Sequence, residues 1–280
     1  IWQKLFDVDT SNTDNGWWNS GLMQSPTGTF YLVGSDDAVS DTLLVRSTLK
    51  RFDRAFNEIS TRVYVKSGVL FLRSIVQIDT NRLALYGETE DTTLQTHGQD
   101  LILMMTDTLG NVLWERTYGG AGIDYATNMI RDSDSTMLLA GGGNSYEDAP
   151  NTSGYFVRVY LNGDTLWSRS FGNPGVGDCL SMLTDFPYFQ HCHLKPGGGD
   201  TEPYIATVSF DGSIENQGYV SSGVPDGPID HRVLDDSSHI VVTGVRTEGL
   251  DQIRVHKWTK DYTEVWRRTY SIGNNDGSYL

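Results

Sequence analysis

The sequence is poor in cysteine, in basic side chains and in long hydrophobic runs. Cys179 and Cys192 are its only cysteines, which excludes a disulfide-rich scaffold and a zinc site built from four thiolates. Lysine and arginine total 21 against 36 aspartates and glutamates, and the formal charge of −15 disfavours binding to nucleic acid or to anionic lipid. The apolar runs have the length of strands and are interrupted by charges, so we expect no transmembrane segment.

Two interpretations of the cysteines remain open. Cys179 and Cys192 are either two separate buried thiols or, if their segments form a hairpin, one disulfide in an oxidising compartment. The chain begins with Ile1 and has no basic segment followed by an apolar one, so we expect a mature or trimmed product.

A short phrase recurs along the chain at even spacing. It reads LWERTYGG at 113–120, LWSRSFGN at 166–173 and VWRRTYSI at 265–272, and the chain opens on a fourth version, IWQKLF. The intervals are roughly fifty residues, a period typical of the blades of a β-propeller. The recurrence therefore predicts a repeated fold and does not by itself indicate a functional site.

Each repeat contains four expected strands joined by turn residues. The middle two are almost continuously apolar, as in TMLLAG and DLILMM, which is typical of a sheet covered on both faces. The fourth alternates charged and aromatic residues, which is typical of a partly solvated edge. Stretches with helical periodicity are lacking.

We therefore predict an all-β chain, a single β-propeller domain over 1–280 built from four-stranded antiparallel blades. Six or more blades are expected in a longer parent chain, and a five-bladed ring closed by the terminal strands is the alternative. The five recognisable repeats and the two partial closing strands have these approximate bounds: 7–64, 65–118, 119–171, 172–220 and 221–270, with 1–6 and 271–280 as the closing strands.

The repeat at 107–143 carries a family resemblance. Its pattern of W-x-R-T-Y-G-G, then aspartate, then a strand ending in Ala-Gly resembles the propeller repeats of secreted and surface proteins of Bacteroidota, many of which are cargo of the type IX secretion system. The resemblance covers essentially the whole chain and is strongest at 107–172. It implies an exported protein, extracellular or on the outer-membrane surface, and it implies no reaction.

Two groups of residues are candidates for metal binding. Asp124, Asp178 and Asp276 follow the fourth strands at matching places, with Asp14 and Asp226 as looser equivalents, so their carboxylates could bind calcium. The alternative, which the periodicity favours, is that each accepts hydrogen bonds within its own turn. His191 and His193 lie on one face of an expected strand and form half of a metal site, but no third ligand is identifiable.

No catalytic motif is recognisable, so we expect a non-catalytic module without a cofactor, with calcium as the exception. The segments 88–100 and 144–154 join second to third strands and are polar and acidic, which suits a protein or glycan partner at the cell surface. The alternatives are a structural subunit of an outer-membrane secretion or adhesion complex and a propeller-based enzyme that acts on glycans. Enzyme activity is the less favoured of these.

Overall fold

The structure is a computed structural model that describes residues 18–37, 45–90, 98–145, 153–171, 182–183, 188–194, 201–219, 226–247 and 250–271. In these ranges the chain forms twenty strands and no helix, which confirms the all-β prediction. The strands make five four-stranded antiparallel sheets, here called A to E. None of the described segments is a helix with the length and hydropathy needed to cross a membrane.

The strands have the following bounds. Sheet A contains β1 (Trp18–Gln24), β2 (Phe30–Asp37), β3 (Val45–Phe52) and β4 (Glu58–Tyr64). Sheet B contains β5 (Leu70–Gln77), β6 (Arg82–Glu90), β7 (Gln99–Asp107) and β8 (Val112–Tyr118). Sheet C contains β9 (Asp124–Arg131), β10 (Thr136–Gly143), β11 (Ser153–Tyr160) and β12 (Thr165–Phe171). Sheet D contains β13 (Met182–Leu183), β14 (Tyr188–Leu194), β15 (Thr201–Val208) and β16 (Ile214–Tyr219). Sheet E contains β17 (Asp226–Val233), β18 (His239–Thr247), β19 (Leu250–Trp258) and β20 (Glu264–Ser271).

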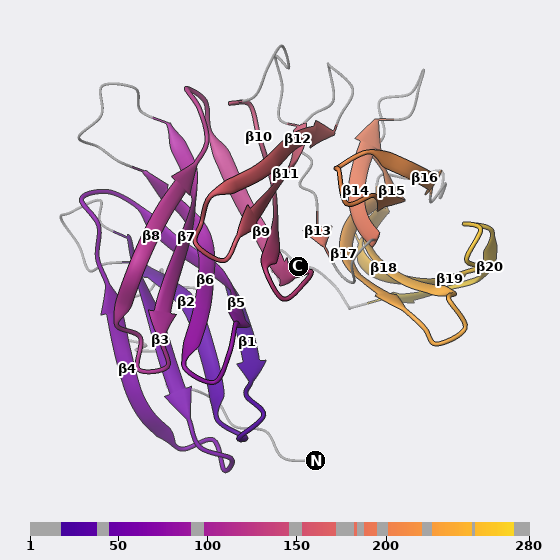
Figure 1. Ribbon diagram of the computed structural model, residues 1–280. Helices are drawn as coiled ribbons and strands as arrows, with labels where there is room; N and C mark the ends of the chain where they lie inside the picture. Colours follow the sequence, from indigo (N-terminus) through magenta and orange to yellow (C-terminus); the bar gives the residue numbers. More distant parts are fainter. Residues whose placement is uncertain are drawn as a thin grey trace.

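Every sheet is a meander in which strands adjacent in sequence are hydrogen-bonded neighbours. The sheets follow one another in chain order, from the indigo sheet A to the yellow end of sheet E (Figure 1). The first strand of each sheet packs against the preceding sheet: β5 against β1 to β3, β9 against β5 to β7, β13 against β9 and β10, and β17 against β14 and β15. Among the described strands, no comparable packing joins sheet E to sheet A.

The core lies between the faces of adjacent sheets. Sheet B shows this most clearly, because Leu83 and Leu85 of β6 pack in a cluster with sheet A while Ala84 and Tyr86 pack in a cluster with sheet C. Successive side chains of a strand point to opposite faces, so a sheet buried on both sides needs apolar residues at nearly every position. Burial along β6 and β10 is accordingly almost continuous, as predicted, whereas β4 and β8 are largely exposed.

The third and fourth strands of all five sheets are joined by the same turn, followed by a shift in strand register. In each turn the N–H of the fourth residue donates to the carbonyl of the first, and the fourth residue has a positive φ. That conformation is free of strain only for glycine, and a glycine followed by a register shift is the usual three-residue hairpin. The fourth residues are Phe56, Gly110, Gly163, Gly212 and Tyr262 in sheets A to E.

The recurring W-x-R-T-Y phrase is a docking motif between sheets. Aromatic side chains at the end of one sheet donate hydrogen bonds to backbone carbonyls in the third-to-fourth strand turn of the next sheet. The three contacts are Tyr64 Oη to Gly110 O (2.9 Å), Tyr118 Oη to Gly163 O (2.8 Å) and Trp167 Nε1 to Phe210 O (2.7 Å). A repeated contact of this kind explains the even spacing of the phrase without invoking chemistry.

Candidate functional site

Most of the predicted metal ligands lie where their side chains are not described. Asp178 and Asp276 fall outside the described residues, as does Cys179. His191 and His193 belong to β14, together with Cys192, and their alternation places the two histidines on one face of that strand. In the described part of the chain, no three His, Cys, Asp or Glu side chains are grouped so that they could hold a metal ion.

Asp124 is the one predicted ligand whose surroundings are fully described. It begins β9, at the register position that Asp226 occupies in β17. Its side chain is completely buried and lies beside Asp100 at the start of β7 in the neighbouring sheet. Neither oxygen of Asp124 nor Oδ1 of Asp100 has a hydrogen-bond partner. The two aspartates therefore form a buried carboxylate pair between sheets B and C.

The environment of this pair favours protonation. Burial raises the pKa of Asp124 to about 6, and the Asp100 carboxylate adds to the rise because two like charges repel. Donors at Ser145 and Gly120 oppose the rise without making a well-directed hydrogen bond to either Asp124 oxygen. Burial also raises the pKa of Asp100.

Two glycines make room for the pair. A side chain at Gly119 would collide with both carboxylates, and one at Gly143 would collide with Asp124. Calcium requires six to eight oxygen ligands, so the three unpartnered oxygens would have to be joined by carbonyls or water. Calcium at Asp124 thus stays a prediction, and a shared proton is the competing way to neutralise the pair.

Asp100 does not stand out in the sequence pattern. The equivalent positions of sheets A, C, D and E are Arg46, Ser153, Glu202 and Gln252, so an acidic residue recurs there in only one other sheet. The only signal was the unusual glycine pair at 119–120, which follows the docking motif of sheet B.

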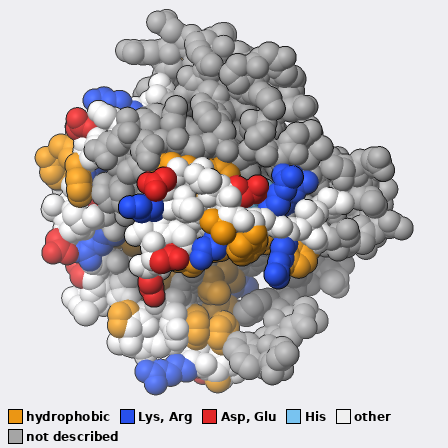
Figure 2. Space-filling model, turned by 90° about the vertical axis from the view of Figure 1, so that its right-hand side faces the viewer, with side chains coloured by type: hydrophobic (Ala, Val, Ile, Leu, Met, Phe, Trp, Pro, Cys, Tyr) orange, Lys and Arg blue, Asp and Glu red, His pale blue; other side chains and the backbone are white. Residues whose placement is uncertain are grey.

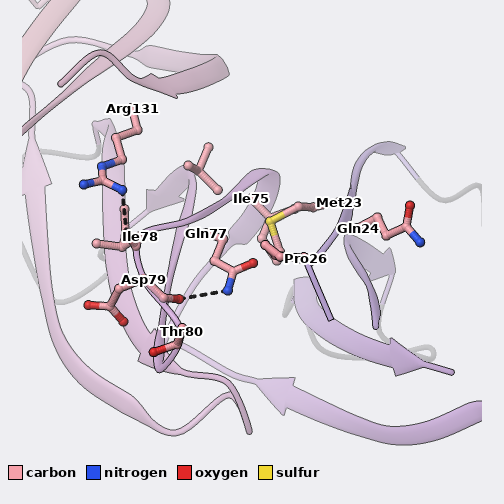
Figure 3. Close-up of a pocket in the computed structure, with 10 residues that line it drawn as sticks. Met23, Gln24, Pro26, Ile75, Gln77, Ile78, Asp79, Thr80 and Arg131 are labelled. Atoms are coloured by element: carbon pink, nitrogen blue, oxygen red, sulfur yellow. Dashed lines mark hydrogen bonds between the residues drawn. The ribbon is translucent and has the colours of Figure 1, made fainter. Parts of the chain in front are cut away.

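A second candidate site is an open pocket of about 510 Å³ between sheets A and B. Met23 and Pro26 of sheet A lie across from Ile75 and Gln77 of β5, and Arg131 from the end of β9 completes the wall (Figure 3). Asp79 and Thr80 of the turn after β5 form its polar rim. The pocket is hence apolar on its walls and polar at its mouth, as ligand sites generally are.

The polar groups of the pocket are held in place. Gln77 Nε2 donates to the carbonyl of Asp79 (2.9 Å), and Arg131 Nη1 donates to the carbonyl of Ile78 (2.7 Å). Gln77 Oε1 is buried and has no hydrogen-bond partner. A buried acceptor without a partner costs free energy, and a ligand N–H can reach this oxygen only after the Gln77 side chain turns toward the pocket.

The pocket and the carboxylate pair lie at opposite ends of the sheets. Met23 and Gln77 lie at the C-terminal ends of β1 and β5. The connections between second and third strands lie at the opposite end of each sheet, where the first strand begins, as the pairing of Leu70 with Thr89 shows. Residues 38–44, 91–97 and 146–152 of these connections lie outside the described residues. The face in Figure 2 intermixes acidic, basic and hydrophobic side chains over its described part, and no region of one charge stands out there.

Comparison with known proteins gives a likeness of fold. No family model and no curated protein matches the chain. A mutant of Synechocystis apocarotenoid oxygenase matches with a TM-score of 0.54 and 9% identity over 91% of this chain. The cobalt-substituted Synechocystis enzyme matches with a TM-score of 0.52 and 10% identity over 94%. The chain spans only 62% of the length of either structure, and at this identity the similarity concerns the fold alone.

Proposed function

We propose that the five sheets are blades of a β-propeller and that the chain is a non-catalytic binding or scaffold module of an exported surface protein. Face-to-face packing of consecutive four-stranded meanders supports the propeller, and six or more blades remain our expectation. Export through a type IX system and an extracellular or outer-membrane address stay part of this proposal. They depend on the resemblance of the repeats.

The observation that carries the binding role is the pocket between sheets A and B. Its aliphatic wall of Met23, Pro26 and Ile75 suits a methyl or methylene group, and the Gln77 amide, turned toward the pocket, offers its unpaired Oε1 to an N–H donor. An amide beside an apolar group supplies both. We therefore propose an amide-bearing partner, either a peptide segment or an acetamido sugar of a glycan.

Binding arrays of peptides and of N-acetylated glycans test this role. We expect wild-type protein to bind amide-bearing ligands, and Gln77→Leu and Met23→Arg to lose that binding. Gln99→Leu is the matched control, because Gln99 lies at the opposite end of sheet B and should bind as wild type does. Failure to bind any ligand of these classes, or binding that survives both pocket substitutions, would contradict the proposal.

An enzymatic role has weaker support. The similar solved structures are named as oxygenases, but that likeness concerns the fold, and the described residues hold no cluster suited to a metal. The polar groups that recur in this chain are engaged in turns and in docking between sheets. Binding without turnover is hence the function that we favour.

A further inference from the structure

Strand β20 carries the docking motif without the docking contact. Its Trp266, Arg268 and Tyr270 occupy the register of Trp114, Arg116 and Tyr118 in β8. Tyr64 and Tyr118, which dock on the next sheet, are 6% and 8% exposed, whereas Tyr270 is 51% exposed. Trp266 is 39% exposed and has the Arg268 guanidinium over its ring. The motif is thus present at the end of sheet E but uncovered.

The three docked interfaces define what the motif binds. The acceptor is a glycine-containing turn between third and fourth strands, because a side chain there would meet the docked residues. An added Cβ at Gly110 would lie 2.9 Å from Tyr64 Oη, and one at Gly163 would lie 2.9 Å from the Trp114 ring. Each such turn belongs to the sheet that follows its donor in the sequence.

An ion pair reinforces one of the three interfaces. Arg116 of β8 forms a salt bridge with Asp164, the residue after the turn glycine, at 3.1 Å. Arg268 stands at the equivalent place in β20. An acidic residue next to the turn glycine would pair with it in the same way.

Sheet A cannot accept β20 in this geometry. Phe56 stands where the acceptor turns have glycine, and its ring packs against the tilted ring of Phe30 with centroids 4.0 Å apart. Sheet E offers no acceptor to a neighbouring molecule either, because Tyr262 takes the glycine position and stacks on His239 at 5.2 Å. Among the described turns, both places without glycine are filled by an aromatic ring of their own sheet.

A second copy of the chain offers no better partner. Its three glycine turns are covered by the sheets that precede them, through Tyr64, Tyr118 and Trp167. The described residues therefore contain no vacant acceptor, in this molecule or in a copy of it.

We infer that Trp266, Arg268 and Tyr270 form an interface for a sixth four-stranded sheet of the same polypeptide, one that follows sheet E and has glycine in its third-to-fourth strand turn. The same-polypeptide assignment follows from the order of the other interfaces, in which every donor precedes its acceptor. It extends an interface that the chain already uses three times, and it does not depend on the binding role of the pocket.

Hydroxyl-radical footprinting with mass spectrometry tests this interface in the polypeptide isolated from its source and in the 280-residue chain. In the 280-residue chain we expect Tyr270 and Trp266 to be oxidised several-fold faster than Tyr118 and Trp114. In the native polypeptide we expect Tyr270 to be as protected as Tyr118. Equal reactivity of Tyr270 in both proteins, or a native polypeptide that ends at Leu280, would overturn the inference.

A pair of mild variants identifies the occupant. Tyr118→Phe should lower the urea midpoint in both proteins, whereas Tyr270→Phe should lower it only in the native polypeptide. Protection of Tyr270 that requires a separate polypeptide, shown by cross-linking, would rule out a same-chain sheet. So would protection that appears in the 280-residue chain as it dimerises.

Discussion

At the scale of single residues, the buried pair of Asp100 and Asp124 needs either a proton or a cation to neutralise its charge. The folded pKa of Asp124, about 6, lies above the value of about 3.9 expected in the unfolded chain. The folded state therefore holds the proton more tightly than the unfolded state does. The stabilising contribution of Asp124 is fully present below about pH 4 and is lost as the pH rises through about 6.

We predict that the free energy of unfolding decreases between pH 4.5 and pH 7 by roughly 2 kcal/mol on account of Asp124. Asp124→Asn, which resembles the protonated acid, should make the curve flatter over this range. Urea unfolding at a series of pH values measures it, with Asp261→Asn on the exposed turn of sheet E as the control. Wild type and Asp124→Asn with the same pH dependence would show that the pair does not hold a proton.

At the scale of strands, one buried salt bridge joins three of them. Arg73 of β5 donates through Nε to both carboxylate oxygens of Glu88 on β6 at 2.9 and 2.8 Å, and Glu88 also accepts the N–H of Ala126 on β9 at 2.8 Å. Glu88 is fully buried and Arg73 is 16% exposed. Sheets B and C are therefore linked through a carboxylate that water does not reach.

We predict that Glu88→Ala lowers the free energy of unfolding by about 3 kcal/mol, because it leaves the Arg73 guanidinium and the Ala126 N–H without their acceptor. Glu115→Ala removes the partner of Lys66 in a solvent-exposed pair and should cost under about 1 kcal/mol. Chemical denaturation of both variants gives the comparison. Equal losses would mean that the buried bridge contributes no more than a surface one.

The strands could be predicted from the sequence because their causes repeat. The apolar run of β10 follows from burial on both faces of its sheet, and the mixed sequence of β8 follows from its exposure at the edge. The same pattern recurs in each repeat. Neither the pairing of Glu88 with Arg73 nor that of Asp100 with Asp124 could be predicted, since no sheet repeats Glu88 and only sheet D, with Glu202, repeats the acid of Asp100. Gln77 could not be singled out either, because its place in a pocket depends on how two sheets pack together.

At the scale of the whole molecule, the charge of −15 opposes folding through self-repulsion. We predict that sodium chloride raises the melting temperature at pH 7, because at about 0.1 M salt it screens exposed charges beyond roughly 10 Å. Calorimetry at increasing salt measures the shift. The same series near the calculated isoelectric point of 4.6 is the control and should show little effect. A melting temperature that falls with added salt at pH 7 would indicate that attractive ion pairs outweigh the repulsion.

The order of the docking contacts also affects how the number of sheets in such a protein could increase or decrease during evolution. Each unit ends in a donor strand and presents its acceptor turn just before it, so a duplicated unit would bring both halves of a new interface with it. Lengthening or shortening the series by one unit would then leave the remaining interfaces unaltered. Phe56 and Tyr262 are the exceptions, because a unit with an aromatic ring at the acceptor position cannot be exchanged for its neighbours without a change of partner. Sheets A and E thus hold fixed places in the series, whereas the glycine turns of B and C accept the same tyrosine contact.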